Sequence, residues 1–505
     1  MLDALVAMYN ALWSATNAYN FYPIARYEAR NLKRRIERNT DATVTADPSN
    51  ILDILTERPK ISVLLPAYKE ERTLGRVVRH TLDCSYPRDR LELILLTEKD
   101  DVRTTEIAKE LEKELVPQYN VKQITVEETH EPRGKPRALN QGLKHATGDV
   151  IGVLDAEDLP DYFLFDEVAK KLNEKDVDVV QARLDMANDY DGLLSTYFRG
   201  EYGFWYRIHL PSLAECRFPV PLSGSSNFFR RELLEKKLDG WDSFNRTEDF
   251  DVGLKIYNEG LNPVRLIDSV TTEESPNLKG WIKQRTRWQR GKTQTIAKIL
   301  RDPPKSFEKK FHSIMTGIVA HGGPINMVGV ATSAVAYMTH TQLDPVTTAL
   351  TYLNLGAIAV NSALQSYGYL LATKGKEVSH RKLKALVNLS APVYWVLQWI
   401  AEGRAIKQSL FDGHIFWEKT EHKGLHFESI DKELQKELAR VQEVWQPYGS
   451  YSIDGWSPPV PLVYIYTTKD KRGKETKVAQ YILTSFTPDG KPVYRLEQIN
   501  STGNS

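Results

Sequence analysis

Cysteine is scarce in this chain: there are two among 505 residues, Cys84 and Cys216. Two cysteines cannot build the disulfide framework of a small secreted domain, and no Cys/His spacing is typical of a zinc site. We therefore expect both to be buried structural thiols. The scarcity favours a reducing, cytosol-facing compartment.

An excess of charge of either sign is also missing. The formal net charge is +1, so the chain gives no electrostatic reason to expect nucleic acid as a partner. Hydrophobic residues make up 41% and charged residues 26% of the chain, which argues against global disorder. No internal repeat is visible. A chain of 505 residues exceeds what one compact core usually organises, so we expect two or more units.

Three long segments contain no Lys, Arg, Asp or Glu: residues 4–25, 311–343 and 345–373. Each is longer than the ~20 residues that span a bilayer, and basic residues lie beside them. The pattern predicts a membrane-type helix with a basic flank at 1–40 and a helical membrane-type region at 306–412. By the positive-inside rule, the domain between them would face the cytoplasm from the cell membrane.

The same segments are nevertheless poor in strongly apolar residues. His321 and Pro324 interrupt the second, Asn354 and Gln365 interrupt the third, and the mean hydropathy of the chain is −0.43. Buried helices of a soluble cytoplasmic or peripherally attached domain are therefore the alternative prediction. The N-terminal stretch also lacks the basic region and the cleavage site of a signal peptide.

Strand and helix patterns alternate through residues 55–305. Apolar strands are expected at 61–65, 91–96, 121–126 and 150–154. Helices are expected between them, at 70–82, 103–115 and 135–146. Such alternation with short loops predicts an α/β fold with a mostly parallel sheet flanked by helices. In such sheets ligands bind beyond the carboxyl ends of the strands, which is where Glu98 and Asp155 stand.

Beyond the helical region the pattern changes twice. Residues 413–447 form an amphipathic segment, with a charged helix expected at 425–445. Residues 448–505 contain strand-like runs at 462–467 and 478–484 and a turn at 488–490. This part predicts a small β-rich C-terminal appendage.

Carboxylates follow two of the predicted strands. Asp155 and Glu157, two residues apart after the strand at 150–154, present oxygen ligands that suit Mg²⁺ or Mn²⁺ together with substrate phosphates. Such a metal would neutralise a pyrophosphate leaving group as a Lewis acid. Solvated loop carboxylates are the alternative for this pair, and capping of the next helix is the alternative for Asp158.

Two later signatures add a base and a binding helix. Asp249, at the start of a helix expected at 250–258, is a candidate general base, although helix capping is the alternative. Gln284, Arg287 and Trp288 place an amide, a guanidinium and an indole on one helix, groups suited to phosphate and to a sugar face. Lys135 and Arg137 start another helix and offer cationic support to a diphosphate, with a solvated basic helix end as the alternative.

In this order, the motifs resemble those of inverting family 2 glycosyltransferases of the GT-A fold, and more narrowly the cellulose-synthase-like membrane enzymes. The resemblance covers about residues 58–300 and extends loosely to 417–422. It is carried by the following stretches: Leu65–Glu70, Gly134–Asn140, Asp155–Asp158, Ser223–Arg230, Gly240–Asp242, Thr247–Asp249 and Gln284–Trp288.

The resemblance implies roles for the matching positions. It makes Asp249 the catalytic base and gives the metal to Asp155 and Glu157. The nucleotide-sugar-binding positions that it implies are Pro66, Glu70, Glu98, Lys135, Asp155, Gln284 and Arg287. The acceptor-binding positions that it implies are Gly224, Ser225, Glu248 and Trp288. Glu98 falls where the family commonly has an aspartate that contacts the nucleobase.

The resemblance also implies a reaction: a single inverting displacement that moves a sugar, usually from a UDP-sugar, to a glycan acceptor at a membrane, with processive polysaccharide synthesis as one form. Glu98 and Glu157 depart from the family's usual aspartates and are one methylene longer each.

Two other hypotheses stay open at this point. In the first hypothesis, the chain is a non-catalytic nucleotide-sugar-binding protein. In the second, it is a soluble and non-processive glycosyltransferase with an ordinary helical C-terminal half. No residue type here encodes the sugar, the linkage or the acceptor.

Overall fold

The computed structural model describes residues 2–40, 58–186, 192–340, 342–374 and 378–411, and three further strands at 463–469, 475–486 and 492–498. The chain divides into two compact units, Met1–Gly424 and Leu425–Ser505. Of the second unit, the structure describes an antiparallel sheet in the order β11-β10-β9. Its strands are β9 (Val463–Lys469), β10 (Glu475–Phe486) and β11 (Pro492–Gln498).

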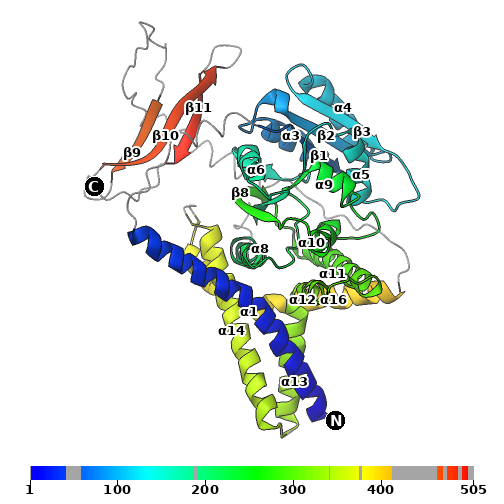
Figure 1. Cartoon of the computed structure of the whole chain (residues 1–505), viewed down its shortest axis with the longest axis vertical. Helices are drawn as coiled ribbons and strands as arrows, with labels where there is room; N and C mark the ends of the chain where they lie inside the picture. Colours follow the sequence, from blue (N-terminus) through cyan, green and yellow to red (C-terminus); the bar gives the residue numbers. More distant parts are fainter. Residues whose placement is uncertain are drawn as a thin grey trace. The chain divides into compact units, whose positions relative to one another are not determined.

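The first unit is built on an eight-stranded sheet in the order β3-β2-β1-β4-β7-β6-β8-β5 (Figure 1). The first four strands along the chain are β1 (Ile61–Ala67), β2 (Leu91–Glu98), β3 (Asn120–Val126) and β4 (Val150–Val153). The others are β5 (Leu159–Pro160), β6 (Val179–Met186), β7 (Asn227–Arg230) and β8 (Arg265–Glu273).

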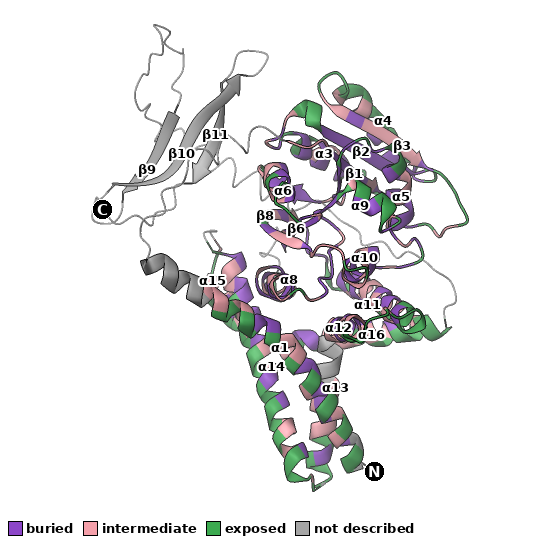
Figure 2. Ribbon diagram, viewed as in Figure 1, coloured by how far each residue is buried: buried purple, intermediate pink, exposed green. Residues whose placement is uncertain are grey.

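One half of this sheet is parallel, as the sequence predicts. Leu64 of β1 pairs with Ile94 of β2 and with Val153 of β4, so the three strands run in one direction and end at one edge. Nearly every residue of β1, β2 and β4 is buried (Figure 2). Strands covered by helices are buried on both faces and are therefore continuous apolar runs. This common edge positions the residues that follow each strand.

The sheet as a whole is mostly parallel, as predicted, but β7 and β5 run against the other strands. β7 runs antiparallel to both β4 and β6, and β5 runs antiparallel to β8, whereas β6 and β8 are parallel. The sheet is therefore mixed. Its antiparallel strand β7 carries Asn227 and directly follows the stretch around Gly224, so the reversal brings that stretch to the carboxyl end of β4.

The helices of the sheet region are α3 (Leu74–Leu82), α4 (Val102–Leu115), α5 (Lys135–His145), α6 (Leu164–Leu172), α7 (Leu193–Phe204), α8 (Leu210–Glu215), α9 (Arg231–Lys236), α10 (Glu248–Asn258) and α11 (Leu278–Arg301). Among them, α3, α4, α5 and α10 correspond to the ranges that the sequence predicts and α11 carries the predicted Gln284–Trp288 segment, whereas α6, α7, α8 and α9 were not predicted. Helix α3 starts later than the expected residue 70, because the carbonyl of Glu70 accepts hydrogen bonds from the amides of Thr73 and Leu74 and closes a turn.

The remaining helices of this unit are α1 (Leu2–Thr40), α12 (Phe307–Val319), α13 (Gly322–Met338), α14 (Pro345–Ala372), α15 (Arg381–Val387) and α16 (Ala391–Phe411). α1 packs against α13 and α14, and α14 packs along α7 (Figure 1). A continuous hydrophobic core joins the sheet to these helices, running from Leu64 through Phe198 to Trp281 and Tyr394.

The membrane-type region is not supported. Within the described residues, no helix is both long enough and apolar enough to cross a membrane. The physical reason is that polar side chains occupy the packed faces. Asn10 of α1 and Asn354 of α14 are fully buried, and the Asn354 side-chain amide donates to the Asn10 carbonyl at 3.1 Å.

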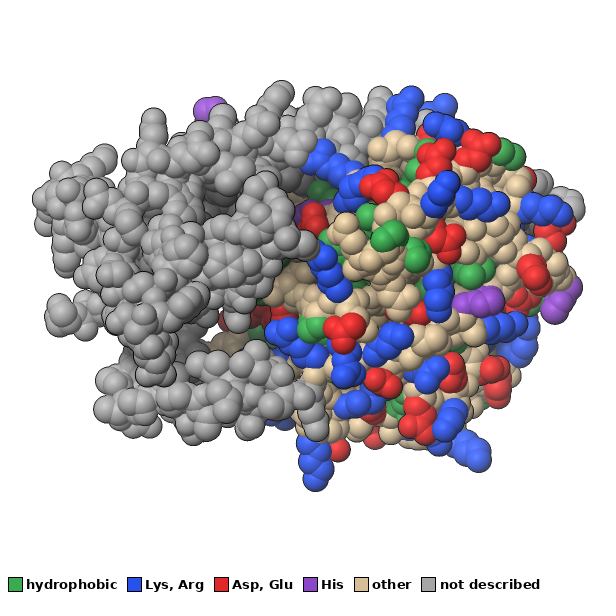
Figure 3. Space-filling model, turned by 90° about the horizontal axis from the view of Figure 1, so that it is seen from above, with side chains coloured by type: hydrophobic (Ala, Val, Ile, Leu, Met, Phe, Trp, Pro, Cys, Tyr) green, Lys and Arg blue, Asp and Glu red, His purple; other side chains and the backbone are tan. Residues whose placement is uncertain are grey.

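The structure bears on several smaller predictions. Cys84 is buried and Cys216 is partly buried, and both are free thiols. The expected charged helix at 425–445 and the turn at 488–490 lie outside the described residues. On the face seen in Figure 3, basic and acidic side chains are interspersed over the described part, as expected from the balanced charge.

Candidate functional site

A cavity of about 350 Å³ lies at the carboxyl ends of β1, β2 and β4. With the exception of Arg137, the positions for which the sequence predicts a role line this one cavity: Pro66, Glu70, Glu98, Lys135, Asp155, Glu157, Gly224, Ser225, Glu248, Asp249, Gln284, Arg287 and Trp288. They come from strand ends, loops and three helices that are distant in sequence. The roles themselves remain predictions, but the structure brings the residues together.

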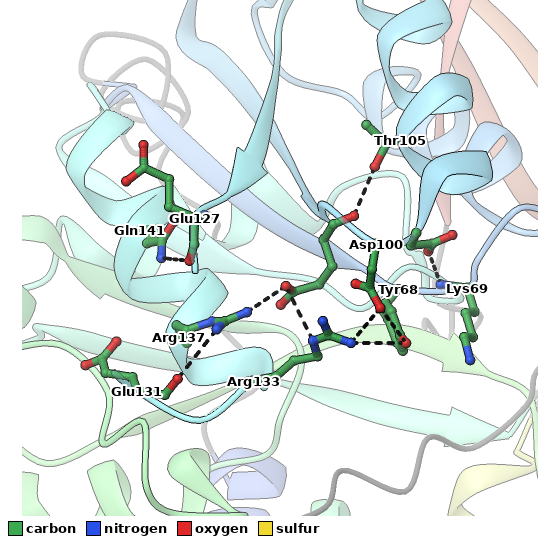
Figure 4. A network of polar contacts seen from close by, with 11 residues as sticks. Tyr68, Lys69, Asp100, Thr105, Glu127, Glu131, Arg133, Arg137 and Gln141 are labelled. Carbon is green, nitrogen blue, oxygen red and sulfur yellow. Dashed lines mark hydrogen bonds and ion pairs between the residues drawn. The ribbon is translucent and has the colours of Figure 1, made fainter. Parts of the chain in front are cut away.

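Glu98, at the end of β2, forms the floor of one end of the cavity. Its carboxylate pairs with the Arg137 guanidinium at 2.6 Å and with Arg133 at 3.8 Å, and Arg133 in turn reaches Asp100 at 2.7 Å (Figure 4). Burial raises the pKa of Glu98, although both arginines act in the opposite direction. Arg137 is buried against Glu98, so the prediction that it supports a diphosphate, or that it is solvated, is wrong.

The loop after β1 holds its shape through buried polar contacts. Lys69 has a φ of 57°, in the left-handed region that residues with side chains seldom adopt. The Lys69 amide donates to the Asp101 carboxylate, which fixes this conformation. The buried Glu70 accepts a hydrogen bond from the Thr73 hydroxyl at 2.9 Å. The loop therefore presents Pro66 and Glu70 to the cavity from a fixed backbone.

Lys135, the first residue of α5, bridges two strand ends. Its ammonium forms a close ion pair with Asp155 and donates to the Gly224 carbonyl at 2.7 Å. Burial alone would lower the pKa of Lys135, but the charges of Asp155 and Glu248 outweigh burial and raise it. A Cβ on Gly224 would lie 3.4 Å from both Asp249 Oδ2 and Lys135 Nζ. Lys135, Asp155 and Asp249 thus meet around Gly224.

Asp158 does not cap a helix, which corrects one of the alternatives. Its carboxylate is fully buried and accepts hydrogen bonds from the Ser225 hydroxyl and from the Asp155 amide. Burial, followed by the charges of Asp155, Glu273 and Glu157, raises the pKa of Asp158 well above its usual value. Asp158 therefore ties the Ser225 loop to the end of β4, beneath the cavity.

The carboxylates at this point fit a divalent cation. The donor set is oxygen only, and Asp155 and Glu157 both line the cavity. The surplus of negative charge that raises the Asp158 pKa is one that a cation would relieve. In the part of the chain that the structure describes, no cluster of three or more His, Cys, Asp or Glu side chains could hold a metal ion alone. Mg²⁺ and Mn²⁺ commonly bind through one or two carboxylates plus substrate phosphates, so this arrangement still suits them.

Asp249 and Glu248 form the first turn of α10, and both carboxylates face the cavity. The cap position is occupied by Thr247, whose side chain makes no capping hydrogen bond. Asp249 Oδ1 accepts from the Phe250 amide of the first turn at 2.8 Å, so Asp249 has part of the capping role that was its alternative, while Oδ2 is directed toward Gly224. Burial and the charge of Asp249 raise the pKa of Glu248 to about 7, and burial raises the pKa of Asp249 as well.

α11 presents Gln284 and Trp288 on one face, a full turn apart. The Gln284 side-chain oxygen is buried and has no hydrogen-bond partner. This helix lies against the start of α10 with no space between them, because a Cβ on Gly291 would come within 2.6 Å of the Thr247 amide nitrogen. The glycine therefore sets the distance between Asp249 and the Gln284–Trp288 segment.

A buried network that the sequence did not reveal supports Trp288. Arg285 makes two hydrogen bonds of 2.7 Å to Glu201 of α7, and the Tyr394 hydroxyl of α16 donates to Glu201 at 2.6 Å. The Arg285 guanidinium lies 4.4 Å from the centre of the Trp288 ring. Three helices thereby hold the indole in place, through interactions that no local sequence pattern predicts.

Other cavity residues were also missed. They include Lys292 of α11, Gln398 of α16 and a set of polar side chains from the charge-free segments: Thr16, Asn17, Asn20, Asn361 and Gln365. Helical spacing gives a signal for Lys292, because residues 284, 288 and 292 are four apart and share one face. Gln365, which interrupts the third charge-free segment, lines this cavity.

Comparison with known proteins identifies a related family. Residues 59–291 match the family described as "Glycosyltransferase like family 2". The chain is 29% identical over 263 residues to the "Probable glycosyltransferase YdaM" of Bacillus subtilis (strain 168), covering 49% of this chain and 58% of that protein. It is 28% identical over 240 residues to a "Poly-beta-1,6-N-acetyl-D-glucosamine synthase" of Staphylococcus epidermidis, covering 46% and 54%.

A solved structure resembles the fold. The mannosyltransferase PcManGT from Pyrobaculum calidifontis, in complex with GDP-Man and Mn²⁺, aligns with a TM-score of 0.50 and 21% sequence identity. The alignment covers 82% of this chain and 100% of that chain. The chain spans only about half the length of the curated relatives it matches. The narrower resemblance to cellulose-synthase-like enzymes stays a prediction.

Proposed function

We propose, from the premise that residues 59–291 are a glycosyltransferase domain of the family 2 type, that this chain transfers a sugar from a nucleoside diphosphate sugar to a glycan acceptor with inversion. One observation carries the proposal: the positions with a predicted role, Arg137 excepted, line the same cavity, although they are spread from Pro66 to Trp288. A scattered set of solvated carboxylates would not converge in this way.

The donor is assigned to the end of the cavity beside Glu98. There the nucleobase would lie against Glu98 and the diphosphate between Lys135 and Arg287, whose positive charges complement phosphate oxygens. We propose a UDP-sugar. PcManGT, which shares the fold, was solved with GDP-Man, so a guanine nucleotide belongs in the same test.

The proposed reaction is a single displacement. The acceptor hydroxyl gives its proton to Asp249 as its oxygen bonds to the anomeric carbon, and the bond from that carbon to the phosphate oxygen breaks with its electron pair leaving on the nucleoside diphosphate. The raised pKa of Asp249 strengthens it as a base. Lys135 and Arg287 hold the leaving diphosphate, and Trp288 orients the acceptor sugar by its face.

A divalent cation is proposed as cofactor, held by Asp155 and Glu157 together with donor phosphates. When bound, Mg²⁺ or Mn²⁺ would supply Lewis-acid stabilisation of the leaving diphosphate. The support is the pair of cavity carboxylates with surplus negative charge, and the Mn²⁺ of PcManGT.

Work at the cytoplasmic face of a cell membrane, with extension of a polysaccharide there, is part of the proposal. Its support is the outward face of α13 and α14, where large apolar side chains are exposed, among them Tyr337, 84% exposed, together with Met338, Val346 and Tyr352. A soluble cytoplasmic enzyme is the alternative. Flotation with phospholipid vesicles distinguishes the two: protein that stays at the bottom of the gradient contradicts membrane association.

The test of activity is a panel of nucleotide sugars (UDP-glucose, UDP-N-acetylglucosamine and GDP-mannose), each with Mg²⁺ or Mn²⁺ and with or without oligosaccharide acceptors. We expect nucleotide release from one donor, faster with an acceptor. Tight nucleotide binding with no release from any donor would instead establish a non-catalytic nucleotide-sugar-binding protein.

A further inference from the structure

Lys292 is a cation inside the cavity for which the proposed reaction has no use. It stands on the same face of α11 as Gln284 and Trp288, about 6 Å beyond Trp288 along the helix axis. The donor end, with Glu98 and Lys135, lies at the strand ends of the sheet. Lys292 therefore belongs to the acceptor side of the cavity.

Lys292 has no carboxylate partner among the described residues. Its ammonium donates to the Ala320 carbonyl, at the end of α12, at 3.0 Å. Two carboxylates whose charges act on Lys292, Glu201 and Glu402, have other partners. Glu201 pairs with Arg285 at 2.7 Å, and Glu402 lies 3.3 Å from His321. A desolvated ammonium without a counter-ion is unfavourable, and burial, then Arg285, lowers the pKa of Lys292 to about 8.

Besides the charged groups that act on Lys292, the cavity offers neutral hydrogen-bond acceptors. Asn361, Gln365 and Gln398 are among the residues that line it. Two further amide oxygens, Asn20 Oδ1 and Gln284 Oε1, are buried without any hydrogen-bond partner. An unpaired buried carbonyl costs free energy until a donor reaches it, and the hydroxyl groups of a sugar are such donors.

We propose that Lys292 is the counter-ion of an anionic group on the acceptor, so that the acceptor side of the cavity selects a hydroxyl-rich molecule carrying a carboxylate or a phosphate. This inference rests on the proposed function, because it names the class of acceptor for the same site. The anion forms the ion pair that Lys292 lacks in the protein, while the unpaired amide oxygens accept from neighbouring hydroxyls.

The two sources of an anion are a uronic acid of a glycan and the phosphate of a lipid-linked sugar. Matched probes separate them: trigalacturonate against neutral galactotriose, and citronellyl phosphate against citronellol. Binding of each probe is measured by calorimetry in the presence of saturating UDP. The proteins are the full chain, Lys292→Gln, Lys292→Arg, and Lys283→Gln as a matched control, since Lys283 is on the same helix but does not line the cavity.

We expect the charged member of one pair to bind about tenfold more tightly than its neutral partner, which corresponds to one ion pair. Lys292→Gln should remove this preference, Lys292→Arg should keep most of it, and Lys283→Gln should leave it unchanged. The pair that shows the preference identifies the source of the anion.

Three results overturn the inference: equal binding of charged and neutral probes to the unaltered protein, a preference that survives in Lys292→Gln, or a loss of UDP affinity in both Lys292 variants, which would assign the cation to the donor. If Lys292→Gln fails to fold, Lys292→Arg and the unaltered protein still decide. The proposed function fails separately, when no donor of the nucleotide-sugar panel releases nucleotide.

Discussion

The two proposed ends of the cavity differ in how completely their charges are paired. At the donor end, charges are paired within the protein: Glu98 with Arg137 and Asp155 with Lys135. At the acceptor end, the Glu201–Arg285 ion pair stands beside neutral amides, and Lys292 has no ion-pair partner among the described residues. The donor end is thus preorganised before any ligand arrives, whereas the acceptor end keeps unsatisfied groups for its ligand.

The difference explains why one end is easier to recognise from sequence. The nucleoside diphosphate of the proposed donor is one constant chemical group, so short motifs with fixed spacing are enough to bind it. An acceptor varies between enzymes, and its binding groups come singly from α1, α11, α14 and α16. The predictions below test whether the two ends act independently, from the largest expected effect to the smallest.

Asp249→Asn should have the largest effect, because Asp249 stands where the two ends meet. Loss of a general base lowers the rate by about 10² to 10⁴-fold. Nucleotide affinity should change little, since Asn keeps the shape of the side chain. Nucleotide release and UDP binding, measured on the same preparations, check both statements. A variant with full turnover would remove Asp249 from the mechanism.

Glu201→Gln should disturb the acceptor end selectively. The change leaves the Arg285 guanidinium buried without its carboxylate, which should lower the free energy of unfolding by about 3 kcal/mol. Since Arg285 lies against Trp288, we expect a higher KM for the acceptor and an unchanged KM for the donor. Urea denaturation and steady-state kinetics measure the two effects. An equal rise in both KM values would show that the ends are not independent.

Glu98→Gln is the matched change at the donor end. It replaces the charged hydrogen bond to Arg137 and should weaken nucleotide binding by about 2 kcal/mol. The acceptor KM should not move. Calorimetric titration with UDP and GDP gives the affinity, and a change in the UDP-to-GDP ratio would show that Glu98 contacts the base.

Gly291→Ala should act through the backbone that joins the ends. The added methyl group would collide with Thr247 and push α11 away from α10, which should cost about 1 to 3 kcal/mol despite the better helix propensity of alanine. We expect a lower kcat and also a weaker UDP affinity, because Arg287, which is proposed to hold the diphosphate, lies on the displaced helix α11. Normal kcat would mean that the two helices separate without moving Asp249.

Glu248→Gln should reveal the smallest effect, a change in pH dependence. The pKa of Glu248 is about 7 in the folded protein, above the ordinary value of 4.5, so its neutral form is favoured by folding. Its contribution to stability is complete below pH 4.5 and is lost as the pH rises through about 7. Thermal unfolding from pH 5 to 8 should therefore show a loss, on the order of 2 kcal/mol, that Glu248→Gln lacks. Parallel curves would contradict the raised pKa.

The parallel half of the sheet could be predicted because its strands are continuous apolar runs ended by turns, as in Ile61–Ala67. Strands β6 and β8 could not be predicted, since they carry charged residues such as Arg183 and Asp268. The membrane-type helices were predicted from long segments without charge and from the basic residues beside them. Absence of charge does not distinguish a lipid-facing surface from a packed face lined by Asn354.

The site was predictable where motifs are contiguous in sequence and not where pairing is long-range. Asp155, Asp249 and Trp288 were identified from local residue order, and the structure places them in one cavity. Glu201 was not identified, because its significance comes from partners on α11 and α16 that are far away along the chain. Lys292 could have been predicted from the sequence, since it follows Trp288 by one helical turn.

The contact between α7 and α14 has a consequence for the shape of the cavity. A Cβ on Gly203 would lie 2.2 Å from the Gly368 carbonyl oxygen, so the two backbones touch with no side chain between them. Helices in such contact cannot slide past each other without a collision of main-chain atoms. The residues that the two helices contribute to the cavity, among them Glu201 and Gln365, therefore keep a fixed separation and move together or not at all.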